Sequence, residues 1–156
     1  MQLTRFTDYC LRVLMYLSYK EETAKSTELT TIAELAESYQ ISTNHLMKVV
    51  HRLAQMGYIE TLRGKGGGMR LARKPSAINL GDVIEHCEES KTIIECLSTD
   101  YSGDCPLLAQ CELQKVLRDA QKAFMAHLKK FSLHDLIANR GAQKALQPLL
   151  FVEAKR

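Results

Sequence analysis

Several patterns that mark large protein classes are missing from this sequence. No apolar run is long enough to span a bilayer, and the opening residues MQLTRFTDYC do not join a basic segment to an apolar one. We therefore expect no membrane segment and no secretory signal, and we place the chain in the cytoplasm, where thiols stay reduced. Glycine-rich nucleotide loops and Ser–His–Asp patterns are missing too, so we do not expect an enzyme.

Tight cysteine pairs are also missing. The sequence has five cysteines, an odd number, and none of them forms a C-x-x-C motif. The odd count argues against a closed disulfide framework, and the spacing argues against a zinc site and a thiol oxidoreductase. Cys10 and Cys87 fall on predicted helices, and we interpret them as buried, unreactive side chains.

The other three cysteines share one polar segment. Eight residues separate Cys96 from Cys105, and five separate Cys105 from Cys111. The segment is rich in Ser, Thr, Asp and Gly, which is a poor setting for burying three thiols. Iron–sulfur clusters accept wide spacing because the cluster itself bridges its ligands, and three thiolates leave one iron position to another group. We predict that this trio holds an iron–sulfur cluster.

Positive charge is concentrated in one stretch, although the net charge of the chain is only +3. Between positions 48 and 74, Glu60 is the only acidic residue. The basic residues of the same stretch are Lys48, Arg52, Arg63, Lys65, Arg70, Arg73 and Lys74. Such a local positive field attracts phosphate groups.

Capping residues and apolar spacing predict a mostly α-helical chain. The elements expected in the first half are a helix from Thr4 to about Lys20, a polar connector over 21–28, a helix opened by a Thr31–Glu34 capping box, a helix from Ser42 to Gly57, strands over 58–62 and 69–72 around RGKGGG, and a helix over 80–87. Two helices joined by a tight turn and followed by a hairpin predict a winged helix-turn-helix with a two-stranded wing.

The second half is expected to form a dimerisation helix. We expect an irregular stretch over 88–110 and a helix of about 25 residues that has Pro106 in its first turn. Its apolar stripe is longer than one small module needs to cover, which predicts pairing with a second copy in a homodimer. A short helix starts at Ser132, and the chain beyond Arg140 looks loosely attached. The predicted division is a DNA-binding domain over 1–75, a cluster loop and dimerisation helix over 76–140, and a tail over 141–156.

Double-stranded DNA is the expected partner. In a winged helix-turn-helix, the first residues of the third helix face the major groove. Here they are Ser42, Thr43, Asn44, His45 and Lys48. Asn44 can pair with adenine, and Lys48 can bind guanine or phosphate. The tip of the wing is basic, has little bulk and suits backbone or minor-groove contact. The tip residues are Arg63, Gly64, Lys65 and Gly66.

Longer segments resemble a known family. The segments MQLTRFTDYCLRVLMYL, STNHLMKVV, RGKGGGMRL and INLGDVI, with the three-cysteine segment, resemble the Rrf2 family of winged-helix transcriptional regulators to about Ile137. Within that family, the chain is most similar to the nitric-oxide-sensing iron–sulfur repressors. The resemblance implies a homodimer that binds promoter DNA and is released when nitric oxide nitrosylates its cluster.

The resemblance also implies the cluster ligands. It assigns Cys96, Cys105 and Cys111 to the cluster and Asp8, from the other subunit, as a fourth ligand. From the residues alone, Asp8 is only an acid in the first turn of a helix. A 4Fe–4S cluster is favoured. The gap from Cys96 to Cys105 is longer than is usual in the family, which leaves 2Fe–2S as the alternative. Members that sense iron–sulfur sufficiency carry a histidine where this chain has Gln114.

Two other functions stay open at this point. One is an iron–sulfur or redox-status regulator of the same family without nitric oxide specificity. The other is a small iron–sulfur electron-transfer protein, against which the predicted wing argues. Responses to nitric oxide, oxygen and iron starvation would separate the first from the nitric oxide sensor, and a footprint on promoter DNA would exclude the second.

Overall fold

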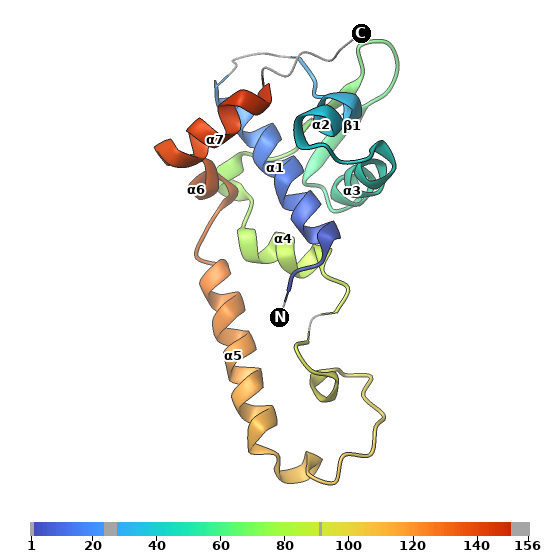
Figure 1. The fold of residues 1–156 in the computed structure, drawn as a ribbon, viewed down its shortest axis with the longest axis vertical. Coiled ribbons are helices and arrows are strands. Elements are labelled where there is room, and N and C mark those ends of the chain that lie inside the picture. Colours follow the sequence, from blue (N-terminus) through green and yellow to red (C-terminus); the bar gives the residue numbers. More distant parts are fainter. Residues whose placement is uncertain (1, 24–27, 91, 151–156) are drawn as a thin grey trace.

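The computed structural model describes residues 2–23, 28–90 and 92–150. A head of packed helices carries a two-stranded sheet, and one helix and a long irregular segment extend away from it (Figure 1). The helices and strands, in chain order, are α1 (Arg5–Thr23), α2 (Ile32–Tyr39), α3 (Thr43–Gln55), β1 (Ile59–Leu62), β2 (Gly68–Leu71), η1 (Pro75–Ala77), α4 (Leu80–Cys87), η2 (Glu95–Leu97), η3 (Leu108–Gln110), α5 (Glu112–Leu128), α6 (Leu133–Ile137) and α7 (Arg140–Leu150).

Helix α1 forms the centre of the head. The Thr4 hydroxyl accepts a hydrogen bond from the Thr7 amide at 3.2 Å, as expected for a cap at this position. Apolar residues at helical spacing, among them Val13, Leu14 and Leu17, are buried along its length. Helices α2 and α3 lie on one side of α1, and α6 and α7 lie on the other (Figure 1). The core of the protein is therefore built around α1.

The winged helix-turn-helix is confirmed. Thr31 and Glu34 form the predicted capping box of α2, and Gln40 ends that helix with a left-handed φ of 53°. Strands β1 and β2 pair antiparallel, with Ile59 opposite Leu71 and Leu62 opposite Gly68. The wing is fixed to the head because the amides and carbonyls of Thr30 and Met69 exchange two hydrogen bonds, at 2.7 and 3.0 Å.

The end of α5 is attached closely to the start of α4. The Asn79 side chain caps α4 and also donates to the Lys129 carbonyl at 2.8 Å. A Cβ on Gly81 would lie 2.4 Å from Lys129 Cγ, so only glycine permits this approach. Lys129 Nζ lies 2.8 Å from a Glu85 carboxylate oxygen and 3.5 Å from one of Asp82. Helix α5 therefore leaves the head at a defined point.

Two predicted helix boundaries were wrong. Helix α1 continues to Thr23, so residues 21–23 are helical and not part of a connector; residues 24–27 lie outside the described residues. Helix α5 begins at Glu112, not near Pro106, because Cys111 takes the cap position and its Sγ accepts from the Gln114 amide. The helix has 17 residues and a length of about 26 Å, shorter than predicted.

The segment after Arg140 is not loosely attached as far as residue 150. It forms α7, in which Leu146 is buried beside Tyr19 and Ile137. The Ser38 hydroxyl of α2 donates to the Leu149 carbonyl at 2.9 Å, which fixes the helix to the head. The remainder of the expected tail, 151–156, lies outside the described residues.

Over the three described ranges, no helix combines the length and the apolar character that a membrane span requires.

Candidate DNA interface and cysteine loop

The first turns of α3 present the predicted contact residues to solvent. Ser42 caps the helix; its hydroxyl accepts from the His45 amide at 3.4 Å and lies 2.9 Å from His45 Nδ1. The opposite face is buried against the head through Leu46, Val49 and Leu53. The exposed residues of this end are Ser42, Thr43, Asn44, His45 and Lys48. Amphipathic spacing therefore turns the polar residues outward together.

The wing tip is exposed and shaped by glycine. Gly64 and Gly66 have φ values of 99° and 80°, a region that other residues rarely adopt. A Cβ on Gly67 would lie 2.4 Å from the Leu62 carbonyl oxygen, inside the hairpin. Arg63 and Lys65 extend from this turn, both exposed. Glycine thus flanks Lys65 on both sides and Arg63 on one side.

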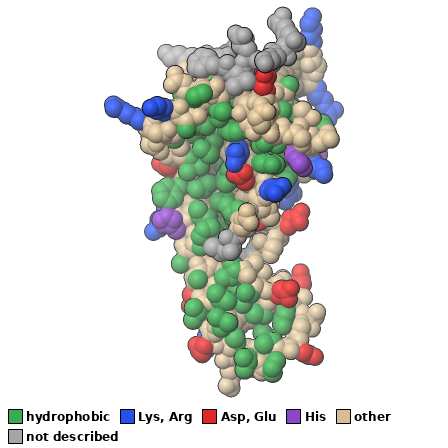
Figure 2. Space-filling view, viewed as in Figure 1, with side chains coloured by type: hydrophobic (Ala, Val, Ile, Leu, Met, Phe, Trp, Pro, Cys, Tyr) green, Lys and Arg blue, Asp and Glu red, His purple; other side chains and the backbone are tan. Residues whose placement is uncertain are grey.

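Lys and Arg side chains gather along the edge of the head that carries α3 and the wing (Figure 2). The end of the molecule formed by α5 and the cysteine segment shows mainly hydrophobic and acidic side chains in the same view (Figure 2). A duplex would be attracted to the α3 and wing edge and not to the other end, because phosphate binds cations.

We call residues 88–111 the cysteine loop. Cys96 lies in η2 and is partly exposed, Cys105 is exposed, and Cys111 is the partly exposed cap of α5. Gln114 links two of them: its side-chain amide donates to the Cys96 carbonyl at 2.7 Å, and its backbone amide donates to Cys111 Sγ at 3.4 Å. The sequence pattern drew attention to Gln114 only because regulators that sense iron–sulfur sufficiency carry a histidine at this position.

The predicted cluster ligands do not converge in the described structure. In residues 2–23, 28–90 and 92–150, no group of three or more His, Cys, Asp or Glu side chains is arranged to hold a metal ion. Asp8 lies in the first turn of α1 and pairs with Arg12 at 2.9 Å, with nearly half of its side chain exposed. The thiols fit an iron–sulfur group by their chemistry and exposure, and Cys111 stands at the N-terminus of α5.

The cysteine loop begins where α4 meets α3 and the base of the wing. Arg52 of α3 donates to the His86 carbonyl at 3.3 Å, and the Tyr58 hydroxyl lies 2.8 Å from His86 Nδ1. Burial raises the pKa of Tyr58 to about 12, so its hydroxyl stays protonated at neutral pH. Arg73 lies over the Tyr58 ring at 5.4 Å. The last turn of α4 thus contacts both α3 and the base of the wing.

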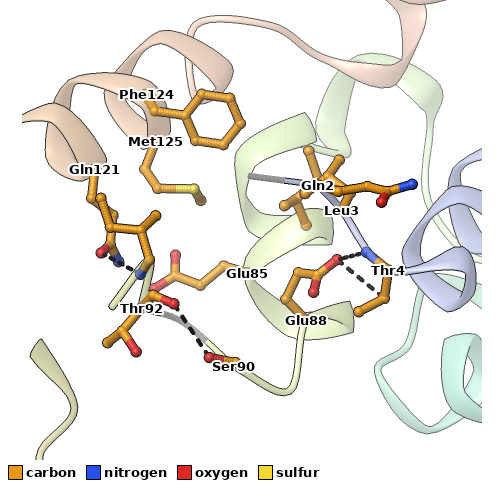
Figure 3. A pocket seen from close by; sticks show the side chains of 12 residues that line it. Gln2, Leu3, Thr4, Glu85, Glu88, Ser90, Thr92, Gln121, Phe124 and Met125 are labelled. Carbon is orange, nitrogen blue, oxygen red and sulfur yellow. Dashed lines mark hydrogen bonds between the residues drawn. The ribbon is translucent and has the colours of Figure 1, made fainter. Parts of the chain in front are cut away.

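Glu88, the first residue of the cysteine loop, connects the loop to the start of α1. Its carboxylate accepts from the Thr4 amide at 2.7 Å and from the Thr4 hydroxyl at 3.1 Å. These contacts border a cavity of about 400 Å³ between the start of α1, the end of α4 and α5 (Figure 3). On its far side, the Ile93 amide donates to the Gln121 side chain of α5 at 3.3 Å. Glu88 and Ile93, both in the first part of the loop, therefore attach it to the head and to α5.

The two cysteines outside the loop are buried in the core. Cys10 of α1 and Cys87 at the end of α4 are 0% and 4% exposed. Interaction with Cys87, followed by burial, raises the pKa of Cys10. Interaction with Cys10 lowers the pKa of Cys87, and the nearby Arg52 charge acts in the same direction. Burial of both side chains agrees with the sequence interpretation.

Comparison with known proteins identifies the family. The Rrf2 family model, described as an iron-dependent transcriptional regulator, matches residues 3–139. The HTH-type transcriptional regulator NsrR of Bacillus subtilis (strain 168) is 44% identical over 140 residues, which cover 90% of this chain and 92% of that protein. The regulator of the same name from Geobacillus kaustophilus is 39% identical over 146 residues, covering 94% and 96% of the two chains.

Solved structures share the fold. CymR (YrzC), the global cysteine regulator of B. subtilis, superimposes with a TM-score of 0.63 at 26% identity, covering 88% of this chain and 97% of its own. IscR of T. potens gives a TM-score of 0.64 at 20% identity, covering 93% of this chain and 90% of its own, and shows likeness of fold alone. These relatives are regulators, in agreement with the expectation that the chain is not an enzyme. The chain belongs to the Rrf2 family of transcriptional regulators.

Proposed function

We propose that the chain is a nitric-oxide-sensitive transcriptional repressor that binds promoter DNA as a homodimer. The observation that carries the proposal is the junction at the end of α4. There Glu88, the first residue of the cysteine loop, contacts Thr4 at the start of α1, and His86, two residues earlier, contacts α3 and the base of the wing. The similarity to regulators named NsrR and the nitric-oxide-sensing resemblance of the sequence segments support the same function. A cytoplasmic location is part of this proposal.

In the proposed complex, the α3 N-terminus reads the major groove. Asn44 can form a bidentate pair with adenine, and Lys48 can bind guanine or phosphate. The same end of the helix also carries Ser42, Thr43 and His45. The tip of the wing approaches the DNA backbone or the minor groove. Its residues are Arg63, Gly64, Lys65 and Gly66. The two heads of a dimer would bind half-sites about 34 Å apart, or a multiple of that distance.

A second copy of the chain is the proposed partner of α5. None of the side chains of α5 is buried in the single chain, and Leu113 and Val116 are 64% and 62% exposed. Leu117 and Phe124, on the predicted stripe, are only partly buried. Pairing of two such helices would remove this apolar surface from water.

Cys96, Cys105 and Cys111 are the proposed ligands of an iron–sulfur cluster, and Asp8 of the other protomer is the proposed fourth. We favour 4Fe–4S, with 2Fe–2S as the alternative. When bound, the cluster supplies iron atoms to which nitric oxide can bind. Gln114 holds the backbone of Cys96 beside the start of α5, and Asp8 pairs with Arg12 through one of its two carboxylate oxygens. The loop residues then restrain the end of α4.

A second candidate is an iron–sulfur or redox-status regulator of the same family. The description of the family model as iron-dependent and the exposure of Cys105 favour this candidate. Promoter affinity after nitric oxide, oxygen or iron depletion separates the two. The first proposal requires the loss of affinity to follow nitric oxide with iron still supplied, whereas the second requires it after oxygen or iron depletion.

The DNA-reading role predicts different effects for two residues of α3. Replacing Asn44 with alanine should cost about 1–3 kcal/mol and relax preference at one base position, because a base-edge contact is lost. Replacing Lys48 with alanine, if its main contact is phosphate, should weaken binding to all sequences and reduce the salt dependence by about one counterion. Titrations on promoter DNA and single-base variants at several salt concentrations measure both effects.

Gln55 provides the matched control for these substitutions. It is exposed on the same helix but lies at the C-terminal end, away from the proposed groove. Gln55→Ala should leave affinity, base preference and salt dependence at the values of the unaltered protein. Equal effects of Asn44→Ala and Gln55→Ala would contradict the assignment of the α3 N-terminus to the groove.

A further inference from the structure

Met47 is an exposed apolar side chain on α3. It lies four residues after the first residue of the helix and is 50% exposed. Within residues 2–23 and 28–90, the other large apolar side chain that is exposed is Leu62 of the wing, at 54%. A single exposed methionine is ordinary on most protein surfaces. These two side chains, however, lie on the two elements that the proposed function assigns to DNA.

Helical spacing places Met47 beside the proposed base-reading residues. Asn44 precedes it by three residues and Thr43 by four, and residues at these spacings are neighbours on a helix surface. Lys48 is the next residue, and His51 lies one turn further along; all four are exposed. The other exposed residues of positions 42–52 are polar as well. Met47 is therefore an apolar side chain within a polar contact surface.

The major groove offers one apolar group to such a side chain. Thymine presents its C5-methyl group there, whereas adenine, guanine and cytosine present hydrogen-bond donors and acceptors. A thioether cannot donate a hydrogen bond and is a weak acceptor, so Met47 has little to gain from the polar base edges. Its unbranched side chain is flexible enough to reach a methyl group in the groove. Contact between the two groups removes apolar surface of both from water.

We propose that Met47 is a specificity-determining residue that contacts the C5-methyl group of a thymine in each half-site. The proposal rests on the placement of the α3 N-terminus in the major groove under the proposed function, and it is independent of the cluster and of nitric oxide. Three residues of a helix rise about 4.5 Å, and successive base pairs are about 3.4 Å apart. The thymine is therefore expected within about two base pairs of the pair that Asn44 reads.

Replacement of single thymines by uracil tests the proposal, because uracil pairs as thymine does and lacks only the methyl group. The probe is a duplex that the unaltered full-length protein selects from random sequence, with uracil placed at one thymine of one half-site at a time. For the unaltered protein, one such replacement should weaken binding about fourfold, the effect of removing one methyl group from an apolar contact. The same replacement should leave the affinity of Met47→Ala unchanged.

A conservative variant and the remaining thymines are the controls. Met47→Leu keeps an apolar side chain of similar volume, so it should remain sensitive to uracil at the same position. Uracil at thymines further from the Asn44 base pair should have equal effects on the unaltered and Met47→Ala proteins. Met47 lies outside the buried core, so unfolding curves of both variants should coincide with that of the unaltered chain.

The proposal is overturned if uracil scanning gives the same profile for Met47→Ala and the unaltered protein. The affinity of Asn44→Ala for the same duplex then identifies which assignment is wrong. Weaker binding by Asn44→Ala would mean that α3 reads the groove without a Met47 contact, so the thymine contact alone is excluded. Unchanged affinity of both Asn44→Ala and Met47→Ala would mean that the placement of α3 in the groove is wrong as well.

Discussion

Replacement of Cys105 by alanine should abolish the visible absorption of the anaerobically prepared protein and lower its affinity for promoter DNA about a thousandfold. A loss of this size is the difference between specific and non-specific DNA binding at the lower end of the usual range. The expected cause is loss of one of three thiolates, which would leave the cysteine loop without a bound group. Cys105 is exposed and contributes nothing to the core, so the fold should be unaffected. Absorption spectra and binding titrations measure the two effects.

Ser102→Ala is the matched control for this substitution. Ser102 is exposed in the same loop and has no thiol, so its replacement should preserve the absorption and the affinity. Unfolding curves of both variants, taken without the cluster, should coincide with that of the unaltered chain. A Cys105→Ala protein that keeps full absorption and promoter affinity would remove Cys105 from the proposed ligand set.

Replacement of Leu14 by alanine should reduce the free energy of unfolding by about 3 kcal/mol. Leu14 is completely buried in α1, the helix around which the core is built. Truncation removes buried apolar atoms and leaves a cavity, and such substitutions cost about 2–5 kcal/mol. Urea denaturation of the cluster-free protein measures the change as a shift in midpoint at constant slope.

Leu62→Ala is the corresponding surface control. Leu62 lies in the wing and is 54% exposed, so its replacement should change the free energy of unfolding by less than about 0.5 kcal/mol. Similar losses for the two leucine variants would show that α1 is not the centre of the core.

Helices with strong local start signals could be predicted from the sequence. The capping box at Thr31 and the caps Ser42 and Ser132 each stand before an apolar helical pattern, and each begins a helix in the structure. The start of α5 was wrong because Pro106 is also compatible with a first helical turn. The actual cap is Cys111, a residue type that is seldom expected to cap a helix.

Helix α7 was missed although a signal was present. Ala142, Leu146 and Leu149 recur at helical spacing, and Leu146 packs beside Tyr19. Pro148 within the segment and its place near the end of the chain favoured an interpretation as a tail. Packing against α1 stabilises the helix, and that contact has no local signature.

Only part of the candidate site could be predicted from the sequence. The exposed end of α3 could be predicted, because amphipathic spacing fixes which residues face outward. The contacts at the end of α4 could not, since Arg52–His86 and Thr4–Glu88 join residues 34 and 84 positions apart. Only the folded chain brings such residues together.

The most direct test of the account is promoter affinity before and after nitric oxide. The anaerobic, cluster-loaded protein is titrated onto promoter DNA, treated with stoichiometric nitric oxide, and titrated again at the same salt concentration. A sample treated with exhausted nitric oxide donor is the control. The account predicts an affinity about a thousandfold lower after nitric oxide and no change in the control. Unchanged affinity in the treated sample would contradict the proposal that the cysteine loop reports nitric oxide to the DNA-reading head.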